Sequence, residues 1–212
     1  MTRRQWIDYT KEFVGKIDPT RQFHQNMVNN ALSLAYENFV YDTYKYRIHE
    51  LDSMGKEYAV SVAQDGTSAR YYSNLPCSII EIDKVGSGIL EVSTTTGYSY
   101  SFVPMYLQEI KRISGLEVEA MTDEIGYALV GEKIYYSSMT TAIQSAGVRM
   151  TVVQQFSEYA LDLDESIPIP KSQSERFMET VLNVLNVVRP ELLLNNNTNT
   201  NAPRTEQPRQ DK

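Results

Sequence analysis

The hydrophobic positions of residues 1–55 recur at the three- and four-residue steps that predict amphipathic helices. The first stripe consists of Trp6, Tyr9, Phe13 and Ile17. Asp18-Pro19 then interrupts the pattern and offers a cap and a first-turn proline to a longer second helix, which we expect to end near Gly55. Its stripe is Phe23, Met27, Ala31, Leu34 or Ala35, Phe39, Thr43 or Tyr44, and Ile48. The pattern predicts a helical hairpin, with His24 and His49 at surface or cap positions.

From Lys56 the hydrophobic period changes to two, which is typical of half-buried strands. Asp65-Gly66 predicts a hairpin that joins residues 58–62 to 68–72, and Gly131-Glu132 predicts a second that joins 127–130 to 133–137. Further strands are predicted at 78–83, 89–93, 98–102 and 148–152, and a helix at 104–113 with Pro104 in its first turn. We therefore expect an antiparallel β-rich body with one inserted helix.

A final helix is predicted after the prolines at 168 and 170, where Ser172 and Glu175 have the spacing of a capping box. Its apolar residues are Phe177, Val181, Leu182, Leu185 and Val188, and Pro190 would stop it. Residues 195–212 contain no large apolar side chain, which predicts a disordered tail. The fold class is α+β: an amino-terminal helical hairpin (1–55), an antiparallel β-rich body (56–170), a carboxy-terminal helix (171–190) and a tail (191–212) that is disordered or becomes ordered on a partner.

Charge is spread unevenly along this acidic chain, whose formal net charge is −7. The net charge is +1 over residues 1–50, −9 over 51–188 and +1 over 189–212. A strongly negative body repels phosphate, which disfavours sequence-specific DNA binding. No apolar run approaches the ~20 residues of a membrane helix, and Asp8, Lys11 and Glu12 occupy the stretch that is apolar in a signal peptide. We expect folding in a cytoplasm and no membrane partner.

The sequence lacks the common motifs for nucleotide binding, a serine nucleophile or catalytic zinc. His24, His49 and the single cysteine Cys77 are too few for a structural zinc site. Cys77 follows Pro76 and precedes an apolar run, so we interpret it as a small core residue. We therefore expect no cofactor, no metal site and no enzymatic activity.

Carboxylate pairs are the remaining candidates for chemistry, because two acids in a cleft can hydrolyse glycosides or bind a divalent metal ion. The pairs are Glu117 with Glu119, Asp123 with Glu124, and Asp162, Asp164 and Glu165. A carboxylate-dependent hydrolase would bring such residues together in a cleft. A structural protein would leave Glu117, Glu119, Asp162 and Asp164 dispersed over its surface. The spacing alone favours solvated faces.

The chain is rich in tyrosine, with 15 Tyr against 6 Phe and 1 Trp. Tyrosine suits half-buried sheet faces as well as protein interfaces, because its ring is apolar and its tip is polar. Leu192, Leu193 and Leu194 form a short apolar segment directly before the polar tail, and a neighbouring subunit could bind it. This composition favours a subunit that contacts copies of itself and other proteins.

Several phrases, in order along residues 1–190, resemble one protein family. The phrases are KEFVGKIDPT, RYYSNLPCSIIEIDKVGSGILEV, GYALVGEKIYYSS and VRMTVVQQFSEYALDLDESIPIPKSQSERFMETVLNVL. They include Leu75-Pro76 before an Ile-rich strand, the pattern G-Y-x-x-x-G-x-x-I-Y-Y, and I-P-I-P before the last helix. This order is similar to that of the head-to-tail connector or neck-ring proteins of tailed phages, above all the crAss-like phages infecting Bacteroidetes.

The resemblance implies a virion structural protein, made in the cytoplasm of a bacterial host and placed beneath the portal in the neck or tail. It implies a cyclic homo-oligomer of about twelve copies through which genome DNA passes without specific binding. The portal and other connector or tail proteins would be its partners. We expect contacts through the amino-terminal helices and the tail, at Trp6, Tyr9, Phe13, Leu192, Leu193 and Leu194. The alternatives are the hydrolase and a binding module that forms no ring.

Overall fold

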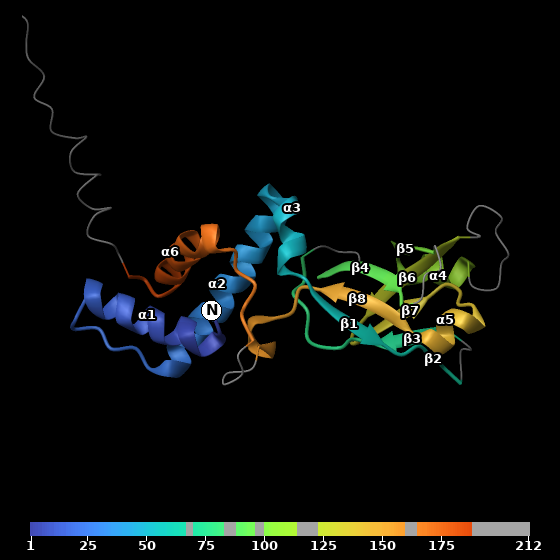
Figure 1. The fold of residues 1–212 in the computed structure, drawn as a ribbon, viewed down its shortest axis with the longest axis horizontal. Coiled ribbons are helices and arrows are strands. Elements are labelled where there is room, and N and C mark those ends of the chain that lie inside the picture. The colour runs from blue at the N-terminus through green and yellow to red at the C-terminus, as the bar shows by residue number, and fades with distance from the viewer. Residues whose placement is uncertain (67–69, 83–87, 96–99, 114–122, 160–164, 188–212) are drawn as a thin grey trace, which may run out of the picture.

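The computed structural model of the chain describes residues 1–66, 70–82, 88–95, 100–113, 123–159 and 165–187. The molecule is elongated, with helices gathered at one end and β-sheets at the other (Figure 1). We call these ends the helical unit and the sheet unit. The predicted α+β class is confirmed, with amino-terminal helices, a strand-rich middle and a last helix.

The helical unit is built from both ends of the described chain. Its helices are α1 (Arg3–Ile17), α2 (Gln25–Tyr46), α3 (Ile48–Leu51) and α6 (Ser174–Val184). α1 begins with a capping box that the sequence analysis missed: Thr2 Oγ1 accepts a hydrogen bond from the Gln5 N–H (3.2 Å), and the Gln5 side chain accepts one from the Thr2 N–H (2.9 Å). These bonds satisfy two amide groups that a helix start leaves unpaired.

The second helix starts later than predicted, because Asp18 serves α1 and not α2. The Asp18 N–H bonds the Val14 carbonyl (2.8 Å) at the end of α1, and its carboxylate accepts a bond from the Thr20 hydroxyl (2.6 Å). Such local bonds favour a turn over a new helix. α2 therefore begins at Gln25, with His24 at its N-cap, which confirms a cap position for this histidine.

The predicted long helix is also interrupted before Gly55. α2 ends at Tyr46, and Arg47 leaves helical geometry with φ −148°. α3 and a 3₁₀ turn at Asp52–Met54 carry the chain onward to Gly55. His49 lies on α3 with an exposed side chain, as predicted.

The described part of the sheet unit forms two sheets. The first has the order β1–β8–β4, with β1 (Lys56–Val60), β8 (Val148–Val152) and β4 (Ile89–Thr94). The second has the order β2–β3–β7–β6–β5, with β2 (Ala63–Gln64), β3 (Tyr71–Asn74), β7 (Lys133–Tyr136), β6 (Glu124–Val130) and β5 (Ser101–Pro104). Every strand pair is antiparallel except β5 with β6, which is parallel.

The first predicted hairpin is mostly wrong, and the second is confirmed. Only β2 pairs with β3 across Asp65-Gly66, whereas β1 pairs along its whole length with β8 in the other sheet. In the second hairpin, β6 and β7 pair around Gly131, whose φ of +60° suits a tight turn. The strand predicted at 78–83 is reduced over its described residues to one bridge between Ile79 and Gln154.

The predicted inserted helix belongs to a strand–helix–strand unit. It is α4 (Leu107–Ile113) and starts after Pro104, because Pro104 is still part of β5 and lies opposite Tyr127 of β6. A parallel pair needs such a crossover connection. A second short helix, α5 (Thr141–Ala146), lies between β7 and β8 and was not predicted.

Both ends of the last helix differ from the prediction. Ser172 does not cap it, since α6 begins at Ser174 after a 3₁₀ turn at Lys171–Gln173, and the structure gives its N-cap no side-chain hydrogen bond. At its other end, Asn186 adopts φ +53°, and the Val187 N–H bonds the Leu182 carbonyl (2.9 Å). This is a Schellman ending, in which asparagine takes the left-handed position. α6 therefore stops well before Pro190.

Two hydrophobic cores correspond to the two units. The core of the sheet unit lies around Ile134, Tyr136, Met150 and Val152. The core of the helical unit joins α1, α2 and α6 with residues that follow β8, namely Val153, Phe156, Tyr159 and Ile167. The chain thus returns to the helical unit at Val153, inside the range 56–170 that was expected to form the β-rich body.

Candidate assembly surfaces

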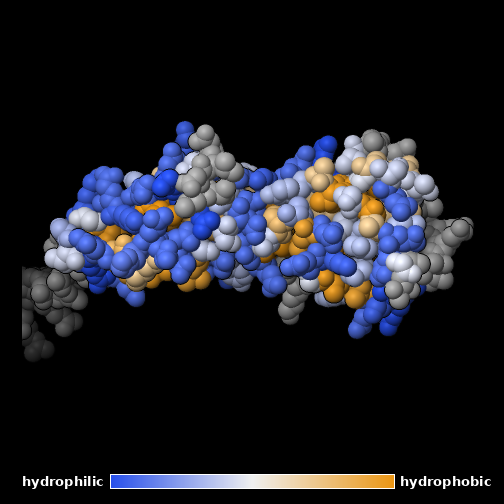
Figure 2. Space-filling view, turned by 90° about the horizontal axis from the view of Figure 1, so that it is seen from below, coloured by the Kyte–Doolittle hydropathy of each residue, from blue (hydrophilic) through white to orange (hydrophobic). Residues whose placement is uncertain are grey.

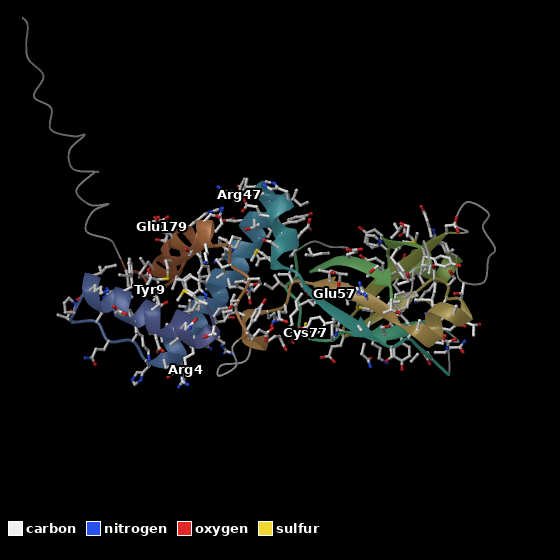
Figure 3. The ribbon with its side chains drawn as sticks, viewed as in Figure 1. Arg4, Tyr9, Arg47, Glu57, Cys77 and Glu179 are labelled. Carbon is white, nitrogen blue, oxygen red and sulfur yellow. The ribbon has the colours of Figure 1, made fainter. Side chains whose placement is uncertain are left out.

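A pocket of about 430 Å³ lies between α1 and α6. Its lining residues are Met1, Trp6, Tyr9, Phe13, Ser174, Glu175 and Met178. The helical spacing of Trp6, Tyr9 and Phe13 places their rings on one side of α1, and Figure 3 locates Tyr9 on α1 and Glu179 on the neighbouring α6. Trp6 packs edge-to-face on Phe177 of α6, with ring centroids 4.9 Å apart. We call this feature the α1–α6 pocket.

The predicted contact residues divide into three groups. Trp6 is only 2% exposed, because Phe177 packs on its ring. Its ring therefore belongs to the core and forms a wall of the pocket, and it is not a free surface residue. Tyr9 is 42% exposed and Phe13 is partly buried, and both face the pocket. The predicted contacts at Leu192, Leu193 and Leu194 lie outside the described residues.

A second apolar surface runs along the outward side of α2. Met27, Leu34 and Tyr41 recur every seven residues and are 51%, 49% and 51% exposed. We call these three residues the α2 stripe. Seven residues make nearly two helical turns, so the three side chains lie in one line. Hydrophobic residues are also exposed over both units on the face in Figure 2.

Met27 and Ile48 were predicted to lie on the buried side of the second helix, and this prediction is wrong because both are exposed. The buried side of α2 comprises Val28, Ala31, Leu32, Ala35, Tyr36, Phe39, Val40 and Thr43. This side is wide because α1 and α6 both pack on α2. A three- and four-residue period predicts the spacing of the buried residues along a helix. It does not predict which side of the helix is exposed when the buried side is this wide.

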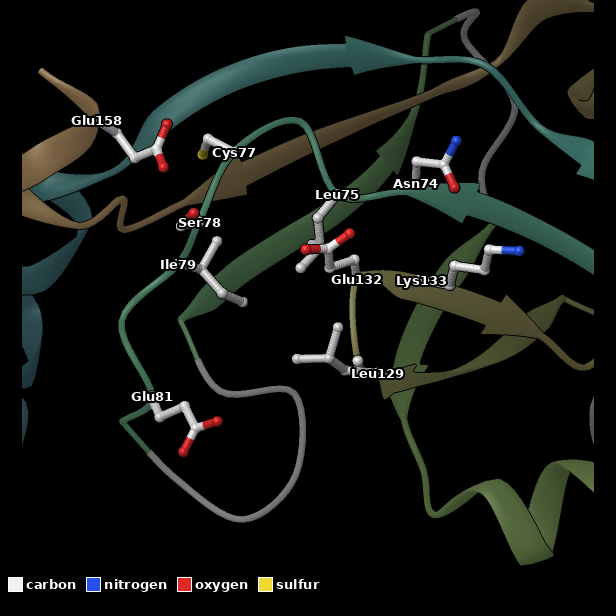
Figure 4. Close-up of a pocket in the computed structure, with 11 residues that line it drawn as sticks. Asn74, Leu75, Cys77, Ser78, Ile79, Glu81, Leu129, Glu132, Lys133 and Glu158 are labelled. Carbon is white, nitrogen blue, oxygen red and sulfur yellow. The ribbon is translucent and has the colours of Figure 1, made fainter. Parts of the chain in front are cut away.

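A second pocket, of about 500 Å³, borders the sheet unit (Figure 4). Three glutamates contribute to its lining: Glu81, Glu132 and Glu158. All three are exposed, and the close-up places Glu81 and Glu158 on separate parts of the wall. Within the described ranges, no three His, Cys, Asp or Glu side chains gather closely enough to hold a metal ion. The described residues of this pocket therefore do not form a carboxylate metal site.

Cys77 lines the same pocket and is partly buried, close to its predicted place in the core. Burial raises the pKa of its thiol above the ordinary value, with a smaller opposing effect of the Tyr58 side chain. A nucleophilic cysteine needs the thiolate, which a raised pKa disfavours. These surroundings suit packing better than thiolate chemistry.

Polar side chains join the two units where the chain crosses between them. Lys56, at the start of β1, donates to Glu165, and the hydrogen bond to this carboxylate is the chief reason that the pKa of Lys56 is raised. Tyr58 donates to the Gln154 side chain, which is buried after β8. These contacts tie the entrance and exit of the sheet unit to the connection that precedes α6.

The predicted carboxylate groups give no common cleft in the described structure. Asp123 and Glu124 are exposed at the start of β6, and Glu165 is engaged with Lys56. Glu117, Glu119, Asp162 and Asp164 lie outside the described residues.

Comparison with known proteins identifies no relative, because no protein-family model and no curated protein matches the sequence. The helices in the described part of the chain, including the long α2, all lack the apolar length that a bilayer crossing requires.

Proposed function

We propose that the chain is a structural subunit of the ring-shaped head-to-tail connector of a tailed phage. The observation that carries this proposal is the α2 stripe, an exposed apolar line on a helix that is otherwise firmly packed. Contiguous apolar surface on a folded subunit marks an interaction site. Apolar residues seven apart on a helix fit the seam of a helix–helix contact.

The shape of the subunit supports a cyclic arrangement. A closed ring requires that one surface of each copy contacts a different surface of the next copy. The α2 stripe lies on the helical unit, while Tyr106 and Val130 are exposed apolar residues on the sheet unit. Exposed apolar side chains on both units are therefore candidates for the two different surfaces of a head-to-tail contact.

The charge of the chain agrees with a channel for DNA. A ring of twelve copies at −7 each would carry a formal charge of roughly −84. Such a charge repels the phosphate backbone at short range, so a duplex would pass through without being held.

The direct test is cryo-electron microscopy of finished phage particles at the vertex between capsid and tail. We expect an elongated density with a helical and a sheet part, repeated around the axis about twelve times. Mass spectrometry of the same particles should detect the chain. Its absence from finished particles would contradict the proposal.

A matched pair of variants tests the α2 stripe itself. Leu34→Asp places a carboxylate in the stripe, and Asn26→Asp places the same charge at an exposed position of the same helix, about 80° around the helix from Leu34. An unpaired carboxylate buried in an apolar contact is costly, so we expect Leu34→Asp to reduce incorporation into particles by roughly ten-fold. Asn26→Asp should be incorporated normally. Equal incorporation of the two variants would exclude the stripe as the contact.

The two alternatives predict different results in the same preparations. A hydrolase would show turnover that disappears in a variant such as Glu132→Gln or Glu158→Gln at the second pocket. A binding module would bind a partner without forming rings on particles. Either result would replace the connector proposal.

A further inference from the structure

The α1–α6 pocket and the point where the chain leaves α6 lie at different ends of this helix. Trp6, Tyr9 and Phe13 line the pocket from α1, and Met178 lines it from the first half of α6. Beyond the other end of α6, the Arg21 guanidinium, just after α1, donates to the Asn186 carbonyl (2.9 Å). The chain therefore leaves α6 beside the end of α1, so a segment that returned along these two helices would reach the pocket.

The direction of the chain changes at this point. Asn186 is in the left-handed conformation, which ends the helix and turns the backbone, and Val187 is buried beside Leu182. The next large apolar residues in the sequence are Leu192, Leu193 and Leu194, which we call the leucine triplet. Beyond the triplet, residues 195–212 contain no large apolar side chain.

The triplet is within reach of the pocket of its own chain. Met178 precedes Val187 by nine residues, which corresponds to about 14 Å along a helix. Leu192 follows Val187 by five positions, and an extended chain of that length spans up to about 17 Å. A short tether of this kind gives the triplet a local concentration in the millimolar range. At protein concentrations below this range, the tether favours the pocket of the same chain over that of a second copy.

The chemistry of the pocket fits a leucine-rich peptide. Its walls are aromatic rings and methionine side chains, and the exposed surface of Met1 and Tyr9 is open to contact. The indole N–H of Trp6 is buried and has no hydrogen-bond partner among the described residues. A peptide brings backbone carbonyls, the acceptors that this group lacks. Glu175 on the rim is also complementary in charge to Arg189, three residues before the triplet.

We propose that the leucine triplet of each chain docks into the α1–α6 pocket of the same chain, where its backbone can accept from the Trp6 indole N–H. The docked segment covers the exposed side of Tyr9 and the accessible part of Phe13. This contact belongs to the single subunit, so it holds or fails independently of the connector proposal.

Trp6 is the single tryptophan of the chain, so its fluorescence reports on the pocket. The test variant changes Leu192, Leu193 and Leu194 to Asp, and the matched control changes Asn195, Asn196 and Asn197 to Asp. Both full-length chains gain the same charge in adjacent segments. We expect the Leu variant to shift Trp6 emission to longer wavelength and to increase quenching by acrylamide, at every protein concentration. Identical spectra for the two variants would overturn the proposal.

A disulfide experiment separates the same chain from a second copy as the source of the triplet. In a Cys77→Ala background, Glu175→Cys with Leu194→Cys should form an intramolecular disulfide under a mild oxidant. The control pairs Leu194→Cys with Asn38→Cys on the outward side of α2. We expect the pocket pair to react roughly ten-fold faster than the control pair. Equal rates, or a disulfide-linked dimer as the main product, would overturn docking within the chain.

Discussion

The helical unit and the sheet unit differ in how their interiors are assembled along the sequence. The interior of the sheet unit is supplied by one continuous part of the chain, from Val62 to Val152. The interior of the helical unit joins α1 and α2 with α6, at the opposite end of the described chain. The sheet unit can therefore form its core without the chain ends, whereas the helical unit cannot.

Because the core of the helical unit needs α6, we expect substitutions in α6 to reduce the stability of this unit the most. Phe177 is fully buried and contacts Trp6 and Phe39 edge-to-face, with centroids 4.9 and 5.7 Å away. One ring from the last helix thus joins the first two helices. Substitutions in each unit test this difference between the two cores, and the first concerns the Phe177 ring.

Phe177→Ala should have the largest effect, a loss of about 3–5 kcal/mol in the free energy of unfolding, because it leaves a cavity between three helices. Trp6 fluorescence during denaturant unfolding would measure it. The exposed Tyr106→Ala is the control and should change stability by less than about 0.5 kcal/mol. If the circular dichroism signal of the strands changed at the same denaturant concentration as Trp6 fluorescence, the two units would unfold together. That result would contradict the expected difference between them.

Gly147→Ala should destabilise the sheet unit by about 2–4 kcal/mol. Gly147 has φ +81°, and an added Cβ would lie 2.6 Å from the Val60 carbonyl oxygen, where β8 meets β1. Gly131→Ala is the matched control, because it has φ +60° but no neighbouring atom within 4 Å of the added Cβ, and should cost about 1 kcal/mol. Unfolding followed through the strands should resolve this order; equal losses would show that the contact with Val60 is unimportant.

Alkaline pH should destabilise the helical unit through its buried tyrosine pair. Burial raises the pKa of Tyr36 to about 12, and burial also raises the pKa of its partner Tyr159. Each folded-state pKa lies above the unfolded value near 10, so this contribution is complete below pH 10 and is lost as pH rises further. Each tyrosine contributes a slope of about 1.4 kcal/mol per pH unit above pH 10.

Tyr36→Phe should make this alkaline loss less steep, and Tyr46→Phe, at an exposed position, should leave it unchanged. Unfolding free energies between pH 9 and pH 11.5 would measure the slopes. A wild-type slope no steeper than that of Tyr36→Phe would mean that Tyr36 ionises freely in the folded protein.

Removal of helix caps should give the smallest losses of stability, and the loss should again differ between the two units. Thr2→Ala disrupts the capping box of α1 and should cost about 1 kcal/mol in the helical unit. Thr140→Ala removes one bond to the Ile143 N–H, of 3.3 Å, at the start of the short α5, and should cost about 0.5 kcal/mol in the sheet unit. Thermal unfolding of the two variants would compare them, and a greater loss for Thr140→Ala would reverse the expected order.

Local structure was predicted well where the residues that interact lie close together in the sequence. The β6–β7 hairpin follows from the residues around Gly131, and α1 follows from its apolar spacing. The pairing of β1 with β8 could not be predicted, because no local pattern relates Lys56 to Val152. The end of α6 was missed because Asn186, and not Pro190, provides the left-handed residue that stops the helix.

The candidate surfaces were predicted only in part, for a similar reason. Tyr9 and Phe13 were identified from α1 alone, but the other wall of their pocket is α6, which no spacing within α1 indicates. The exposure of Leu34 depends on where α1 and α6 press on α2. A heptad count from Met27 through Tyr41 would have found the α2 stripe, since the same step leads on to the exposed Ile48.

The return of the chain to the helical unit at Val153 also sets an order for events during synthesis. β8 leaves the ribosome before Phe177 does, so the nascent sheet unit can begin to fold while α1 and α2 still lack their third helix. The helical end closes only after α6 has also left the ribosome. A product truncated before α6 would therefore have a folded sheet end and an open helical end.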